Sequence, residues 1–198
     1  MNRLLCAAAC LAALAGCASS APAVRRMDVN EVRDLSGRWN DTDSRLVAEE
    51  MIADSLSRPW LQKAAAGGRQ PAVIVQTVRN QSMEHINTDT FVEDLQRSLI
   101  NSGRVAFIAS KAERAELRQE RFDQDANASE DTRKAHGQET GADYALNGVI
   151  NAVEDRAEGE VVVLYQVNLK LTDLKTNQIV WNGQKKIKKN VQRPSATW

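Results

Sequence analysis

The last third of the chain alternates apolar and polar side chains with a period of two. Residues 144–152 place Leu146 and Ile150 on one face, and residues 163–171 repeat the pattern around Val167. Successive side chains of a β-strand point to opposite faces, so alternation of this kind predicts strands with one face in a core and one face in water. Any fold proposed for this chain therefore has to contain an antiparallel sheet.

Short polar stretches at 154–160 and 173–177 separate these two runs from a third, residues 178–187. Connections of this length join neighbouring antiparallel strands, which predicts a three-stranded meander. The third run and the residues after it hold four lysines, Lys185, Lys186, Lys188 and Lys189. We interpret them as protection of an edge strand against pairing with other chains. The alternative is contact with an anionic envelope component, such as lipid headgroups or cell-wall polymer.

An earlier stretch predicts a parallel unit. Residues 72–78 form a near-continuous apolar run typical of an internal strand buried on both faces. Residues 88–100 carry one apolar stripe at helical spacing, and residues 104–109 form a second apolar run. A strand, a helix and a strand in this order are typical of a right-handed parallel crossover.

Helices are also expected elsewhere. Apolar residues at i, i+4 spacing predict one from Thr42 to about Ser57, followed by a short helix that begins near Pro59 and ends at Gly67. A charged helix is expected from Ser110 to about Asp123, and a further helix from Ser129 to about Gly141. The predicted fold is a single α/β domain, with a mixed sheet of one parallel β-α-β unit and a C-terminal antiparallel meander, flanked by helices.

All three cysteines, Cys6, Cys10 and Cys17, lie at the N-terminus. Residues 1–16 have the basic start, apolar centre and small-residue end of a secretory signal peptide. The string ending in Gly16 and Cys17 resembles a lipobox, which predicts cleavage between these two residues and acylation of Cys17, with palmitate among the acyl chains. The alternative is an ordinary signal peptide that contains cysteines.

Residues 17–35 then form the lipidated cysteine and a short tether, and residues 36–198 form the globular domain. The ~17 tether residues reach at most roughly 55 to 60 Å when fully extended. Ala18 after the cysteine resembles the outer-membrane sorting signal of enterobacterial lipoproteins. We therefore expect an outer-membrane lipid anchor, with the domain facing the periplasm.

Charge and motifs exclude several classes of function. Lys+Arg and Asp+Glu are both 26, so the chain lacks the basic excess of a general nucleic-acid binder. Nucleotide-binding, zinc-protease and serine-hydrolase motifs are absent, and no catalytic residue is expected. The oxygen-rich stretch 123–131 resembles a calcium loop, but Ala128 and Lys134 stand where glycine and glutamate are needed. We expect neither a metal nor a cofactor; a metal or small-ligand site around His85 is the minor alternative.

Several strings together resemble the LpoB family of penicillin-binding protein activators. Besides the lipobox they are residues 35–44, 47–48, 75–82, 95–105, 141–146 and 179–183. The resemblance implies a fold similar to the curli secretion lipoprotein CsgG and the amino-terminal domain of TolB. It also implies a non-catalytic outer-membrane lipoprotein that binds and activates a bifunctional, class A penicillin-binding protein, and so regulates peptidoglycan synthesis and cell shape.

Five residues are candidates for partner contact: Arg38, Trp39, Arg79, Asn80 and His85. The first two combine arginine and tryptophan in a turn beside the tether, and the others lie in the loop expected after the first strand. Such loops often carry ligand sites in α/β folds. The alternative function is a lipoprotein subunit of another envelope assembly with a CsgG-like or TolB-like fold.

Overall fold

The computed structural model describes residues 24–132 and 137–192 of the 198-residue chain. The expected signal peptide and Cys17 lie outside the described residues. The chain divides into two compact units at Val32 and Arg33, and all described helices and strands belong to the second. No helix in the described ranges is long and apolar enough to cross a membrane.

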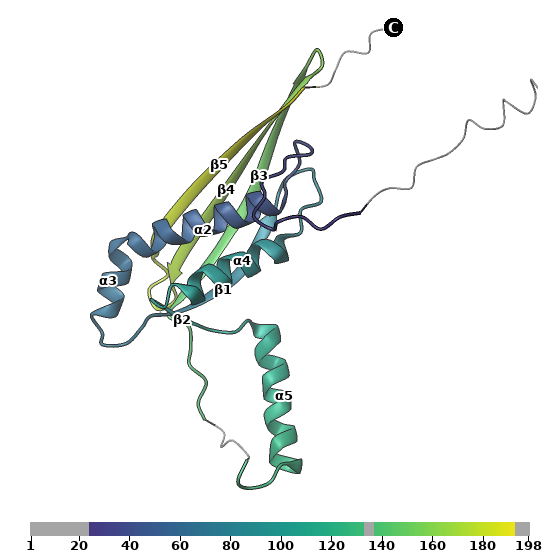
Figure 1. The fold of residues 1–198 in the computed structure, drawn as a ribbon. Coiled ribbons are helices and arrows are strands. Elements are labelled where there is room, and N and C mark those ends of the chain that lie inside the picture. Colours follow the sequence, from purple (N-terminus) through teal and green to yellow (C-terminus); the bar gives the residue numbers. More distant parts are fainter. Residues whose placement is uncertain (1–23, 133–136, 193–198) are drawn as a thin grey trace, which may run out of the picture. The chain divides into compact units, whose positions relative to one another are not determined.

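The second unit is a mixed five-stranded sheet with helices, as the sequence predicts (Figure 1). The strands are β1 (Ala72–Asn80), β2 (Ala106–Phe107), β3 (Tyr144–Ala157), β4 (Glu160–Asp173) and β5 (Ile179–Gln192). The described helices are α2 (Asp41–Ser57), α3 (Pro59–Ala65), α4 (Thr88–Asn101) and α5 (Lys111–Asn127). The strand order is β2-β1-β3-β4-β5, in which β1 pairs in parallel with β2 and β3, and β3, β4 and β5 pair antiparallel.

The meander strands are longer than the alternation alone suggests. The expected polar loop at 154–160 shrinks to a two-residue turn at Glu158 and Gly159, because β3 runs on to Ala157. Both turn residues have positive φ, 32° and 84°. Such a turn matches the twist of the strands that it joins, which extends the hairpin pairing up to Ala157 and Glu160.

The core lies between one face of the sheet and helices α2 and α4, which Figure 1 shows on the same side of the strands. Alternate residues of β4 are buried against them, from Val163 through Tyr165 to Leu171. The opposite face carries partly exposed or exposed polar side chains such as Asn168 and Lys170. The expectation that β1 is buried on both faces is therefore wrong after Ile74, since Gln76 and Thr77 are exposed.

Two other expectations are corrected. The second apolar strand, expected over 104–109, is only Ala106–Phe107, because the chain turns away from β1 toward α5. The helix expected from Ser129 to about Gly141 is absent from its described part. Ser129 instead forms a local turn, in which its carbonyl accepts from Thr132 N–H at 3.1 Å, and residues 137–141 are not helical. Residues 133–136 lie outside the described residues.

Candidate partner-binding surface

Trp39, an expected contact residue, is held within the domain through both of its N–H groups. Its backbone N–H donates to Glu84 Oε2 at 3.2 Å, and its indole Nε1 donates to Ser44 Oγ at 2.8 Å. The ring meets Phe91 and Tyr165 edge-on, with centroid distances of 6.0 and 5.5 Å. Trp39 thus fastens the segment that precedes α2 to the core.

Tyr165 is a second side chain that holds the segment before α2 on the core. Its buried hydroxyl lies within hydrogen-bonding distance of Glu84 Oε1 and, at 3.0 Å, of the Gly37 carbonyl oxygen. Burial and the adjacent Glu84 carboxylate raise the pKa of Tyr165 well above its ordinary value, so the phenol stays protonated and remains a donor. The tyrosine therefore connects the middle of β4 to both the chain before α2 and the loop after β1.

Lys189 on β5 is the third side chain that holds the segment before α2 on the domain. Its Nζ donates to Asp43 Oδ2 at 2.6 Å, to Asp34 Oδ1 at 2.8 Å and to the Arg38 carbonyl at 3.1 Å. The Lys189 and Asp43 side chains are only 8% and 9% exposed, while Asp34 is 52% exposed. Burial lowers the pKa of Lys189, but the hydrogen bonds to Asp34 and Asp43 outweigh it, so the net pKa is raised and the amine stays charged.

The four lysines of β5 divide between the two faces of the sheet. Lys185 lies on the same face as Lys189 and pairs with Glu50 of α2, whereas Lys186 and Lys188 are exposed on the opposite face. The strand is at the edge of the sheet, as expected. The sequence gives no sign that Lys189 is buried, because its acidic partners lie some 150 positions away in the chain.

The loop after β1 is shaped by Asn80, another expected contact residue. Asn80 Oδ1 accepts from Ser82 N–H at 2.9 Å and Oγ at 2.7 Å, and its Nδ2 donates to the Glu84 carbonyl at 2.7 Å. Asn80 therefore shapes the loop from within. Met83, at 103% relative exposure, and His85 are among the side chains that this loop presents to solvent.

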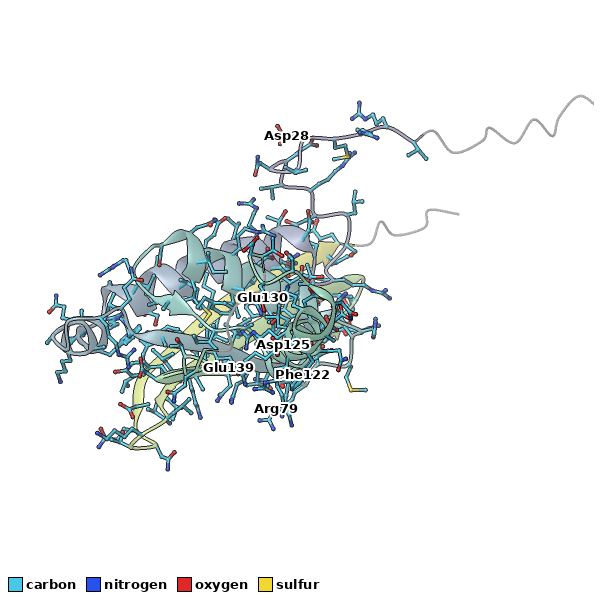
Figure 2. All side chains as sticks on the ribbon, turned by 90° about the horizontal axis from the view of Figure 1, so that it is seen from below. Asp28, Arg79, Phe122, Asp125, Glu130 and Glu139 are labelled. Atoms are coloured by element: carbon cyan, nitrogen blue, oxygen red, sulfur yellow. The ribbon has the colours of Figure 1, made fainter. Side chains whose placement is uncertain are left out.

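The two arginines among the candidates are both exposed. Arg38 has its carbonyl bound to Lys189 and its side chain in solvent beside the loop that contains Glu84. Figure 2 shows Arg79, which leaves β1 on the sheet face away from α2 and α4. The structure thus gathers Arg38, Trp39, Asn80 and His85 around Glu84, and places Arg79 on a different face.

A cavity of about 390 Å³ opens between the segment before α2, the loop after β1 and the β3–β4 hairpin. Its lining includes Val161, Val163 and Val191, and its rim includes Arg38 and Met83. We call this the valine cavity. Sequence reasoning missed it, because Val161 and Val163 lie on β4, Val191 lies on β5, and the rest of the lining comes from the loop after β1 and the segment before α2.

Gly37 allows the segment before α2 to lie close to Val191 of β5 in the wall of the valine cavity. A Cβ atom at this position would lie 2.6 Å from Val191 Cγ2. The turn that contains Arg38 and Trp39 therefore lies against β5 at its glycine.

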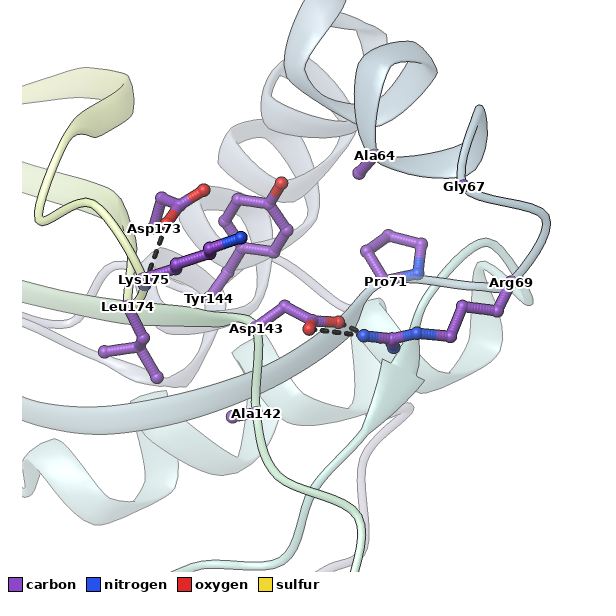
Figure 3. A pocket seen from close by; sticks show the side chains of 10 residues that line it. All are labelled: Ala64, Gly67, Arg69, Pro71, Ala142, Asp143, Tyr144, Asp173, Leu174 and Lys175. Atoms are coloured by element: carbon purple, nitrogen blue, oxygen red, sulfur yellow. Dashed lines mark hydrogen bonds and ion pairs between the residues drawn. The ribbon is translucent and has the colours of Figure 1, made fainter.

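A second cavity, of about 430 Å³, lies beside Tyr144 and Arg69 (Figure 3). The Arg69 guanidinium donates to both oxygens of Asp143, at 2.8 and 2.6 Å, and Asp143 Oδ2 also accepts from Ala72 N–H at 2.8 Å. The ion pair with Arg69 lowers the pKa of Asp143. The charged groups here tie the loop before β3 to the start of β1.

Among the described residues, no group of three or more His, Cys, Asp or Glu side chains is placed to hold a metal ion. Much of the calcium-like stretch belongs to α5, where Asn127 Nδ2 donates to Asp123 Oδ1 at 2.9 Å across one helical turn. Helical backbone separates the oxygens that a calcium loop would bring together.

Comparison with known proteins identifies the family. Residues 43–187 match the family model described as peptidoglycan-synthase activator LpoB. No curated protein matches the chain. Among solved structures, the LpoB C-terminal domain from Escherichia coli is 17% identical, covers 73% of this chain and 98% of its own, and has a TM-score of 0.43.

The Salmonella enterica domain is 16% identical, with the same two coverages and a TM-score of 0.42. Lipoprotein GNA1162 from Neisseria meningitidis is 15% identical, covers 64% of this chain and 88% of its own, and has a TM-score of 0.38. Because the family model spans well over half of the sequence, including most of α2, the parallel unit and most of the meander, the chain belongs to the LpoB family of peptidoglycan-synthase activators.

Proposed function

We propose that this chain is a non-catalytic lipoprotein that binds and activates a class A penicillin-binding protein and thereby regulates cell-wall synthesis. The observation that carries the proposal is the match to the synthase-activator model over residues 43–187. The lipobox at Cys17 adds an outer-membrane anchor that leaves the domain in the periplasm. The mechanism is preferential binding to an active conformation of the synthase, which raises the population of that conformation.

The rim of the valine cavity is the contact surface that we propose. Met83 is fully exposed beside Arg38, and exposed methionine and arginine are enriched at protein interfaces. His85 extends the same surface along the loop. Trp39, Tyr165 and Lys189 hold the two sides of this surface in place, so little conformational entropy is lost when a partner binds.

The decisive experiment measures synthase activity directly. The full chain, purified from membranes in detergent, is added to the class A penicillin-binding proteins of the same envelope, and glycan polymerisation and peptide cross-linking are both followed. We expect both rates to rise, and the synthase to be recovered with the chain in a pull-down. Recovery of none of these synthases, together with unchanged rates, would refute the proposal.

The surface is tested separately by Met83→Ala combined with Arg38→Ala and His85→Ala. We expect weaker synthase binding, with the fold retained because all three side chains are exposed. Lys175→Ala, at the cavity beside Tyr144, is the matched control and should bind as the unaltered chain does. Equal binding by the triple variant would remove this surface from consideration while leaving activation itself open to measurement.

The anchor is tested by Cys17→Ser. The serine cannot form a thioether to a diacylglycerol, so the variant should leave the membrane fraction and appear in the soluble periplasm. Retention of the variant in outer-membrane fractions would refute the lipobox assignment.

A further inference from the structure

The outer edge of β1 is mostly unpaired in the described residues. Strand β2 meets β1 only at Ala72 and Val73, and the last backbone bond between them runs from Ile108 N–H to the Val73 carbonyl at 2.9 Å. Strand β1 nevertheless continues to Asn80. Beyond Val73, no described strand lies on the side of β1 that faces away from β3.

The unpaired edge presents backbone groups in a usable order. Both backbone polar groups of a strand residue point to one edge, and the edge alternates along the strand. Since the Val73 carbonyl faces β2, the N–H and carbonyl of Val75 face the same open side. A register shift with β3 follows between Val75 and Val78, and the residues within it, Gln76 and Thr77, are exposed.

A groove of about 330 Å³ follows this edge, between β1, α4 and the beginning of α5. We call it the edge groove. Val75, Val78 and Val92 supply its apolar lining, and Gln76 and Thr77 supply polar groups. It thus combines an unpaired strand edge with apolar side chains beside it, which are the two features that strand addition uses.

The charge of the edge groove has one sign. Asp89, Glu93 and Glu113 contribute three carboxylates, and no lysine or arginine belongs to the described lining. Hydrogen bonds from Ser110 lower the pKa of Glu113, which therefore stays ionised at neutral pH. Within the described part of the chain, neither Asp89 nor Glu93 forms an ion pair.

We infer that the edge groove binds an extended peptide segment of a partner protein that carries lysine or arginine side chains. The segment adds a short strand beside β1, with backbone hydrogen bonds to the open edge and basic side chains against Asp89 and Glu93. The stretch from Val75 to Val78 is about 13 Å long at ~3.3 Å per residue, which suits a four-residue contact. This surface is separate from the valine cavity rim, so the inference stands independently of synthase activation.

The probe is a fluorescent six-residue peptide of alternating valine and lysine, titrated into the full chain in detergent at low salt. We expect saturable binding, detected by anisotropy, and backbone amide shift changes confined to Val75–Val78 and Val92. Replacing lysine by glutamate in the peptide should abolish binding. Methylating alternate backbone nitrogens, which removes donors while keeping every side chain, should weaken it at least tenfold.

Protein variants test the same assignment. Asp89→Asn with Glu93→Gln should weaken the lysine peptide about fivefold or more at low salt, because it removes two carboxylate charges from the groove. Glu116→Gln with Glu130→Gln changes the same number of exposed carboxylates outside the groove and should have little effect. No binding at millimolar peptide, or equal binding by the methylated or glutamate peptides, would overturn the inference. So would a dimer of this chain that the groove variant dissociates.

Discussion

At the scale of single residues, Lys189 is the side chain whose role differs most from its sequence context. It stands in a lysine-rich edge strand, where solvent exposure is the ordinary expectation, yet its side chain is only 8% exposed and pairs with two aspartates. Both side chains of the Lys189–Asp43 ion pair are buried, so water cannot solvate the remaining charge if its partner is removed.

Lys189→Met should therefore destabilise the domain by about 3 kcal/mol, since it leaves the Asp43 carboxylate buried without its cation. Urea unfolding followed by circular dichroism measures the loss. Lys186→Met, on the exposed face of the same strand, is the control and should change the free energy of unfolding by less than about 0.5 kcal/mol. Equal effects of the two substitutions would contradict the ion-pair assignment.

Tyr165→Phe tests the hydrogen bonds of the Tyr165 hydroxyl. The variant keeps the ring but removes the donor shared by Glu84 and the Gly37 carbonyl, at an expected cost of about 1 to 2 kcal/mol. Hydrogen exchange should also accelerate in the loop that contains Glu84. Tyr144→Phe is the matched control, because the Tyr144 hydroxyl forms no hydrogen bond within the described residues. Unchanged stability and unchanged exchange in the Tyr165 variant would show that these hydrogen bonds do not stabilise the domain.

At the scale of elements, the strength of the periodic signal decided which expectations held. Period-two alternation is strong in β3 and β4, and both strands lie where it predicts. The helical stripe of α4 is equally local, and α4 lies where it predicts. The N-cap of α2 is Asn40, which forms a reciprocal capping box with Asp43. The helix expected after Ser129, which is absent from the described part of that stretch, depended on this residue as a cap and had few apolar residues to bury a helical face.

The candidate site was less accessible to sequence reasoning than the strands were. Local spacing indicated the segment with Trp39 and the loop with His85, but it could not reveal that Glu84 joins them. Glu84 is 45 positions from Trp39 and 81 from Tyr165, so their hydrogen bonds depend on tertiary pairing. For the same reason, the sequence did not indicate that Trp39 has a structural role. Arg38 and His85 are exposed, so their contact with a partner remains a prediction.

Close packing between β3 and β4 gives an element-scale prediction at Gly148. A Cβ atom there would lie 2.4 Å from Leu169 Cδ2 and 2.5 Å from the Asn168 carbonyl oxygen. Because the backbone oxygen cannot rotate away, Gly148→Ala should destabilise the sheet by about 1 to 3 kcal/mol. Gly141→Ala has open space around its added methyl and is the control in a thermal unfolding series. An unchanged melting temperature for the Gly148 variant would contradict this packing.

At the scale of the whole molecule, carboxylates distributed over the domain set its response to acid. The pKa values of Asp34, Asp54 and Asp143 are lowered from that of an ordinary aspartate, because each accepts hydrogen bonds from a basic side chain: Lys189, Arg58 and Arg69 respectively. A depressed pKa means that the unfolded state binds protons first as the pH falls. Burial raises the pKa of Asp94, which has the opposite effect.

We therefore expect the stability from these three aspartates to be complete above their unfolded pKa and to be lost as the pH falls below about 4. Urea midpoints measured from pH 7 to pH 2.5 give the profile. Asp143→Asn should flatten its acid limb by removing one titration, while Asp28→Asn, outside the second unit, should leave the slope unchanged. A profile that is flat from pH 5 to pH 2.5 would contradict the assignment.

The contact of Asp34 with Lys189 also has a mechanical consequence. Tension applied along the chain from its N-terminal side reaches the domain at the junction of Asp34, Asp43 and Lys189, which belong to the incoming segment, α2 and β5. The force is thus shared between α2, near the start of the domain, and β5, near its end. We expect the half-exposed contacts of Asp34, with Lys189 and with Asn40 Nδ2, to break and re-form under such a pull before the sheet loses its register.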